Sequence, residues 1–422
     1  MLPTMLRLRQ TFARPRLTDI PGSVARSLQA AGLPIKRGDT VAVGAGSRGI
    51  ANVDVIVGAT VRWLRDLGAR PFVFPAMGSH GGGTAEGQLS VLEHYGITEA
   101  TMGCPVRATM DVTQVGEALG LPVWLDRYAG EADWIGLVNR IKPHTDFGSA
   151  VTGSGLVKMS AIGLGKAEGA FRCHWAAATR GHERVLRAVS RVVLGHLPRV
   201  YGVGLVEDGS HRIALIEPMH GSEFFDREPA LLAKARAWMP VLPFPEVDVL
   251  VVDEIGKDIS GTGMDTNIVG RGVDLQPMPN RRTAVSAIYV RGLTPASHGN
   301  AIGIGMADIV SDRLVEAMDR HKTYTNAVSA MTPGTARVSI HFPTDRECLG
   351  AALRVSAADP AAPRIVRIRH TLALDRVVVS DAYAQAIADR SDLTVLVPPT
   401  EWRFDDAGNF DSATDLLAGV LA

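Results

Sequence analysis

The sequence predicts an α/β protein composed of two α/β domains with largely parallel sheets. Short apolar runs alternate along the chain with stretches that have helical periodicity. The runs lack the strict in-and-out alternation of a half-exposed strand, which is typical of parallel strands covered on both faces. Several of them lead directly into glycine-rich loops. Because ligands of such sheets bind beyond the carboxyl ends of the strands, we expect the active site there, in the crevice between the domains.

The length and the proline distribution predict where the domains meet. The chain has 422 residues, more than one ordinary domain of roughly 150 residues. Pro240, Pro243 and Pro245 interrupt regular structure within a few residues of one another. We predict an N-terminal domain of residues 1–242, which carries the site, and a C-terminal domain of residues 243–422, whose last residues have room to pack back on the first domain.

Composition excludes several classes of protein. Lys+Arg and Asp+Glu both number 44, which leaves no basic surface for nucleic acid or an anionic membrane. Cys104, Cys173 and Cys348 are far apart in the sequence, so we interpret them as inert thiols. We find no signal peptide and no apolar run of about 18 residues, so we expect a cytoplasmic protein. The oligomeric state is not predicted.

The first strand–helix–strand unit ends each strand in a glycine-rich turn. Strands are predicted at Thr40–Val43 and Pro71–Phe74, with a helix between them. Gly44, Gly46 and Gly49 meet the local form of the dinucleotide-binding fingerprint, but the second strand does not end in the acidic residue that would hold a ribose. We therefore interpret the turn as presenting backbone amides and Arg48 to another anion, such as a carboxylate.

The second strand leads into the loop Gly78-Ser79-His80-Gly81-Gly82-Gly83. No Gly-Lys-Ser/Thr follows, so the loop is not a P-loop. A lone loop histidine is usually a solvated bystander. His80 is a better candidate because it follows a strand end and its glycine neighbours allow a ligand to approach closely.

The richest stretch runs from Asn139 to His174 and includes His144 and Lys158. A helix near Gln114–Leu119 and a strand at Pro122–Leu125 are predicted before it, followed by a buried strand at Trp134–Val138. Arg48, His80 and His144 each follow the end of a predicted strand. If these strands are parallel neighbours, the three side chains converge at one edge of the sheet.

The second domain repeats the pattern of a buried strand followed by a glycine-rich loop. A strand at Asp248–Asp253 precedes a loop that carries Lys257, and a strand at Ala284–Val290 precedes a loop with His298 and Asn300. Lys257 is the candidate substrate-binding cation here. His298 and Asn300 are candidate substrate contacts. A helix over residues 309–318 and strands at Ile365–Ile368 and Leu393–Val397 complete the prediction.

These residue types suit proton transfer on an anionic molecule. Histidines at two strand ends can act as acid and base on opposite sides of a substrate, because each titrates near neutral pH. Arg48 and Lys257 would hold the anion, which favours racemisation or epimerisation of a small acid. Lys158 could be a covalent attachment point. A metal at His80, His144 or His174 is also possible, although none of these histidines has the close partner of a zinc site.

At Lys142-Pro-His144, Gly155-Leu-Val-Lys158 and Cys173-His174, with Gly78-Ser79-His80 upstream and Gly256-Lys257-Asp258 downstream, the chain resembles the nickel-dependent lactate racemase family. The resemblance covers nearly the whole chain. It implies a nickel-pincer nucleotide, of the pyridinium-3,5-bisthiocarboxylic acid mononucleotide type, that is tethered to Lys158. It also implies that His174 is a nickel ligand and that Gly78 and Ser79 bind the cofactor.

The resemblance further implies a mechanism in which His80 and His144 alternate as acid and base while hydride moves to and from the cofactor. Arg48 and Lys257 would orient the substrate, and maturation proteins would supply the cofactor. The chain departs from the lactate racemases at Ala45, at Gly81 and in the longer segment from His144 to Lys158. We therefore predict a racemase or epimerase of a 2-hydroxy acid other than, or in addition to, lactate. The alternatives are a nickel-free anion- or nucleotide-binding protein and a hydro-lyase.

Overall fold

The computed structural model describes residues 2–12, 16–46, 49–197 and 199–411. The chain forms two compact units. The N-terminal unit consists of residues 14–144 and 149–239, and the C-terminal unit consists of residues 1–13, 145–148 and 240–422. The predicted domain bounds, 1–242 and 243–422, stay predictions, as does the crevice between the domains. Arg48 and the last residues, 412–422, lie outside the described residues.

The N-terminal unit contains a five-stranded sheet in the order β3-β2-β6-β7-β8. Its strands are β2 (Thr40–Ala45), β3 (Arg70–Pro75), β6 (Trp134–Arg140), β7 (Val200–Glu207) and β8 (Ile213–His220). All neighbouring pairs are parallel except β7 with β8. The predicted apolar runs are therefore buried strands of a largely parallel sheet, which confirms the α/β class.

Helices pack on this sheet and form the core. On one face Val41, Val43 and Ile56 belong to a buried cluster that includes α1 and α2. The helices are α1 (Ile20–Ala30), α2 (Val53–Asp66), α3 (Ala85–His94), α4 (Glu99–Met102), α5 (Arg127–Gly130), α6 (Leu156–Lys158), α7 (Lys166–Arg180), α8 (His182–His196) and α9 (Phe224–Trp238). A π-helical turn, Met159–Gly163, joins α6 to the loop before α7. Short 3-10 helices span Gly81–Gly83 and Gly221–Glu223.

The helix predicted near Gln114–Leu119 is wrong, because this segment is a strand. β4 (Val112–Ala118) pairs antiparallel with β5 (Leu121–Asp126), the strand that was predicted at Pro122–Leu125. Leu119 and Gly120 connect them with φ angles of 54° and 71°. Positive φ at both central residues is the geometry of a tight hairpin turn, so pairing across the turn overrides the weak helical pattern.

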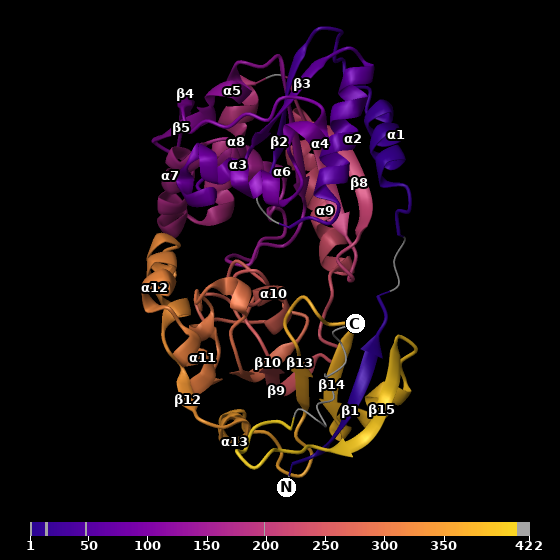
Figure 1. The fold of residues 1–422 in the computed structure, drawn as a ribbon, viewed down its shortest axis with the longest axis vertical. Coiled ribbons are helices and arrows are strands. Elements are labelled where there is room, and N and C mark those ends of the chain that lie inside the picture. Colours follow the sequence, from indigo (N-terminus) through magenta and orange to yellow (C-terminus); the bar gives the residue numbers. More distant parts are fainter. Residues whose placement is uncertain (1, 13–15, 47–48, 198, 412–422) are drawn as a thin grey trace. The chain divides into compact units, whose positions relative to one another are not determined.

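The C-terminal unit contains an eight-stranded sheet in the order β12-β11-β10-β9-β13-β14-β1-β15. The strands β9 to β13 pair in parallel with one another, whereas the pairs β13–β14, β14–β1 and β1–β15 are antiparallel. The bounds are β1 (Thr4–Gln10), β9 (Glu246–Val252), β10 (Ala284–Val290), β11 (Ile309–Ser311), β12 (Ile340–Phe342), β13 (Ile365–Ile368), β14 (Arg376–Ser380) and β15 (Leu393–Glu401). The N-terminal strand β1, indigo in Figure 1, therefore lies beside the yellow β15.

The helices of this unit are short. They are α10 (Thr266–Val269), α11 (Asp312–Ala317), α12 (Arg320–Ser329), α13 (Asp345–Val355) and α14 (Ala384–Ala388), with 3-10 helices at Pro295–Ser297, Ile304–Met306, Pro333–Ala336 and Asp381–Tyr383. The helix predicted over residues 309–318 begins only at Asp312, because β11 occupies its first three residues. In the described part of the chain, none of the helices has both the length and the apolar character that a membrane span needs.

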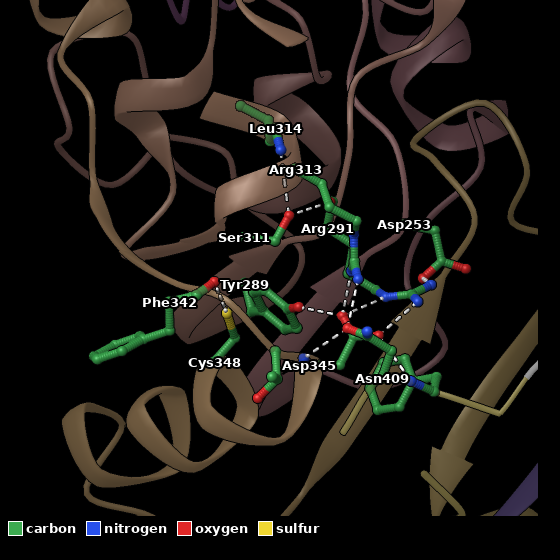
Figure 2. Close-up of polar contacts among 12 residues, drawn as sticks. Asp253, Tyr289, Arg291, Ser311, Arg313, Leu314, Phe342, Asp345, Cys348 and Asn409 are labelled. Carbon is green, nitrogen blue, oxygen red and sulfur yellow. Dashed lines mark hydrogen bonds and ion pairs between the residues drawn. The ribbon is translucent and has the colours of Figure 1, made fainter. Parts of the chain in front are cut away.

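A buried polar network joins the carboxyl ends of β9 and β10 to the start of α13 (Figure 2). Arg291 forms ion pairs with Asp253 at 2.9 Å and with Asp345 at 2.8 Å. The Tyr289 hydroxyl and the Arg313 guanidinium also donate to Asp345, at 2.5 Å and 2.6 Å. Because these charges are mutually paired, the network cross-links the fold.

Candidate functional site

The predicted site loops leave the same edge of one sheet. β2 lies between β3 and β6, and both pairings are parallel, which confirms that the three strands are parallel neighbours. Ala45 is in register with Pro75 on β3 and with Val138 on β6, so the strands end at a similar level. The loops that carry His80 and His144 therefore begin at the same edge of the sheet, on either side of β2.

His144 and Lys158 are in contact. The Lys158 Nζ and the His144 Nε2 are hydrogen-bonded, and both side chains are half-buried. Two backbone hydrogen bonds of 2.8 Å join Lys142 and Ser154, which lie shortly before His144 and Lys158. They hold together the two ends of the segment between β6 and α6. The candidate tether, Lys158, and the candidate base, His144, thus lie next to each other beyond the end of β6.

Two polar side chains hold the start of the helix that bears Lys158. Glu228, buried on α9, accepts a hydrogen bond from the Val157 backbone at 2.9 Å. The Asn139 side chain donates to the Gly155 carbonyl at 2.9 Å. A Cβ at Gly155 would lie 2.5 Å from the Glu228 Oε1, so only glycine fits there. Glu228 was not predicted, because a lone glutamate in a helix carries no local signal.

Glu228 is electrostatically unusual. Burial raises the pKa of its carboxyl to about 7, although the backbone hydrogen bonds from Val157 and Leu156 favour the charged form. Among the described residues its Oε1 has no hydrogen-bond partner. The carboxyl that supports the Lys158 helix therefore changes charge near neutral pH.

The loop that carries His80 packs against the segment between Lys158 and His174. Gly78 has a φ of +61°, and a Cβ there would lie 3.1 Å from Ile162 and 3.3 Å from Ala170. Its backbone nitrogen donates to the Gly163 carbonyl at 3.3 Å. Ser79 and His80 follow with exposed side chains. The positive φ favours glycine at position 78, and a Cβ there would also crowd Ile162 and Ala170.

His174 lies on α7 and is half-buried, between the buried Cys173 and the exposed Trp175. Burial raises the pKa of the Cys173 thiol to about 12, which disfavours the reactive thiolate. Among the described residues, no group of three or more His, Cys, Asp or Glu side chains could hold a metal ion.

Lys257 belongs to the C-terminal unit and lies in a cluster of amides. Its Nζ donates to the Gly261 carbonyl and to the Asn326 Oδ1, both at 2.8 Å. Asn300 also donates to the Asn326 Oδ1, at 3.1 Å. Lys257 and Asn300, which were predicted as separate candidates, thus both bind the side chain of Asn326. Asn326 was not predicted. A single asparagine on α12 gives no signal of its own.

Comparison with known proteins identifies the fold. No protein-family model and no curated protein matches the sequence. The structure is similar to the lactate racemase apoprotein from Thermoanaerobacterium thermosaccharolyticum, with a TM-score of 0.54 and 12% identity over 87% of this chain and 93% of that one. A structural-genomics target from Thermotoga maritima aligns with a TM-score of 0.49 and 14% identity over 75% of this chain and 81% of that one. The chain has a lactate racemase-like α/β fold.

Proposed function

We propose that this protein is a racemase or epimerase of a 2-hydroxy acid other than, or in addition to, lactate. The observation that carries the proposal is the contact between His144 and Lys158 beyond a parallel strand. It pairs a candidate base with the lysine that the sequence nominates as a tether, within a lactate racemase-like fold. His174 follows Lys158 by sixteen residues, the spacing on which the resemblance depends.

The residues around Lys158 fit a tethered nickel-pincer nucleotide. Lys158 would carry the covalent bond, His174 would be the protein's nickel ligand, and Gly78 and Ser79 would border the nucleotide. A Cβ would be crowded at Gly78 and would collide with the Glu228 carboxyl at Gly155, so both glycines allow close packing of the segments around Lys158. When bound, the nucleotide would supply the acceptor and donor of the hydride that leaves and re-enters the substrate α-carbon. The maturation proteins that build it would be the protein's partners.

In this proposal the chain's own residues bind the acid and move its hydroxyl proton. A neutral imidazole at position 80 or 144 removes the proton from one enantiomer, and the other imidazole serves the opposite enantiomer. The ammonium of Lys257 attracts the carboxylate, and Arg48 has the same role. Asn300 and Asn326 surround Lys257 with amide groups, which favours a substrate more polar than lactate.

Mass spectrometry on protein co-produced with a cofactor-making pathway tests the proposal. We expect a nickel-bearing adduct of nucleotide size on the peptide that contains Lys158. Lys158→Arg, which keeps the charge but cannot form the same linkage, is the matched control and should carry no adduct. The loaded protein is then screened against chiral 2-hydroxy acids. An unmodified, nickel-free wild-type chain would refute the proposal and favour a nickel-free binding protein.

Turnover in D2O separates the racemase from a hydro-lyase. Because the α-hydrogen is returned within the active site, the inverted product should retain protium at the α-carbon. The rival hydro-lyase would instead give an unsaturated product. Deuterium at the α-carbon would contradict internal return of hydride, and NMR of the isolated product distinguishes these outcomes.

A further inference from the structure

Lys166, the first residue of α7, is a fully buried lysine in a backbone conformation that lysine rarely adopts. Its side chain has no exposed surface, and its φ is +53°. Glycine would occupy the left-handed region without steric cost. The backbone conformation alone would favour glycine at this position. The presence of lysine therefore points to a role for its side chain.

The ammonium of Lys166 has a partner in each of three segments. It donates to the Pro75 carbonyl at the end of β3 at 2.9 Å and to the Gln88 Oε1 at 2.7 Å, and it lies 3.2 Å from the Asp126 Oδ2. Asp126 is also fully buried. Two hydrogen-bond acceptors and one ion-pair partner surround the ammonium, which offsets part of the cost of its removal from water.

Gln88 extends this contact to the loop that bears His80. The Gln88 Nε2 donates to the Gly78 carbonyl at 2.7 Å and to the His80 carbonyl at 3.2 Å. The Gln88 Oε1 accepts a hydrogen bond from Lys166, so the oxygen and the nitrogen of the amide are both hydrogen-bonded. The buried ammonium and the backbone of His80 are thus linked through one side chain.

The same lysine lies on the segment that joins Lys158 to His174. The Asp126 backbone nitrogen donates to the Leu164 carbonyl at 2.7 Å, two residues before Lys166. α7 begins at Lys166 and carries His174 two turns later. Lys166 therefore fixes the loop of His80 to the segment that bears the tether and the nickel-ligand candidate.

We propose that Lys166, acting through Gln88, is the positioning residue that holds the His80 loop against the Lys158–His174 segment. The catalytic consequence rests on the proposed function, since it requires His80 to act as acid and base. The structural consequence does not, because the loop is positioned whether or not a cofactor is bound.

Two variants of Gln88 test this inference with the full chain. Gln88→Met removes both hydrogen-bonding ends of the amide. Gln88→Glu keeps an acceptor for Lys166 but removes the donor to the Gly78 and His80 carbonyls. Val61→Ala, a truncation in the buried core of α2 in the same unit, is the control for general destabilisation. Circular dichroism establishes that each variant is folded.

The first readout is amide hydrogen exchange of residues 76–84 in the unloaded protein. We expect exchange roughly tenfold faster in both Gln88 variants and unchanged exchange in Val61→Ala, because local opening there requires loss of the amide contacts. The second readout is the loaded enzyme, in which both Gln88 variants should lower kcat by about tenfold or more with little change in KM.

The outcomes separate the inference from the proposed function. Unchanged exchange in both Gln88 variants overturns the inference even if racemase activity is present. Equal acceleration in Val61→Ala also overturns it, since the effect would then be general. If no nickel adduct forms in any protein, the proposed function fails, and faster exchange confined to the Gln88 variants still supports the positioning role.

Discussion

Glu228 makes a residue-scale prediction about pH. Its pKa is raised from 4.5 to about 7 by burial, so the folded state holds a proton that the unfolded state releases. Stability should therefore fall as pH rises from about 4.5 to about 7, by at most roughly 3.5 kcal/mol, and stay low above that range. The Glu228→Gln variant should not show this decrease in stability. Urea unfolding at pH 5 and pH 8 measures it, and equal pH dependence in both proteins would contradict the prediction.

His80 and His144 make a second residue-scale prediction. If they alternate as acid and base, His80→Ala and His144→Ala should each lower kcat of the loaded enzyme by about 10²-fold or more in both directions. His94→Ala is the matched control, because His94 is exposed on α3 of the same unit. Racemisation assays on each enantiomer measure the effect. Full activity in either site variant would remove that histidine from the mechanism.

At the scale of elements, the sequence predicted strands well where burial alone defines them. β2, β3, β6 and β10 lie within a few residues of their predicted bounds. The hairpin strand β4 was missed because its burial is partial and its pairing with β5 decides its structure. No strand was predicted at β1, because both of its partners lie in the last fifty residues.

The candidate site was predictable to a similar extent. Loop residues after strand ends could be named, because strand ends are visible as apolar runs that stop. The residues that hold those loops could not. Glu228 lies 71 residues from its partner Val157, and Lys166 lies 78 residues from Gln88. Contacts at such separations depend on the folded topology and leave no local pattern in a single sequence.

The polar network of the C-terminal unit makes an element-scale prediction. Burial raises the pKa of Asp345, but the hydrogen bonds and charge of Arg291 outweigh it and hold the pKa well below its usual value. Its contribution to stability is therefore complete above the usual pKa near 4 and is lost as pH falls further. Asp345→Asn should destabilise the protein by about 3–5 kcal/mol at neutral pH, because Arg291 and Arg313 lose a buried partner.

Urea unfolding at neutral pH measures this loss. Asp312→Asn is the control, because Asp312 is hydrogen-bonded to the exposed His341 side chain at the surface. We expect that change to cost no more than about 1 kcal/mol. Equal losses of stability in the two variants would show that the buried contacts of Asp345 stabilise the protein no more than a surface contact does.

At the scale of the whole molecule, the first residues of the chain complete a sheet formed by the last. β1 pairs with β14 on one side and β15 on the other, and among the described strands β15 has only β1 as a neighbour. Met5 and Leu8 of β1 are fully buried. The C-terminal unit is therefore not a contiguous piece of sequence, and residues 240–422 lack an internal strand of their sheet.

Removing residues 1–13 should accordingly destabilise β14 and β15, which lie near the C-terminal end of the chain. Peptides from β14 and β15 should lose protection against hydrogen exchange, because both strands lose the hydrogen bonds that β1 supplied. β2 and β6 should stay protected, because their sheet does not include β1. Arg9→Ala, which changes an exposed side chain of β1, is the control and should leave exchange unchanged. Retained protection of β15 in the truncated chain would mean that β1 is dispensable, and a chain starting at residue 14 would then contain everything that the C-terminal unit needs to fold.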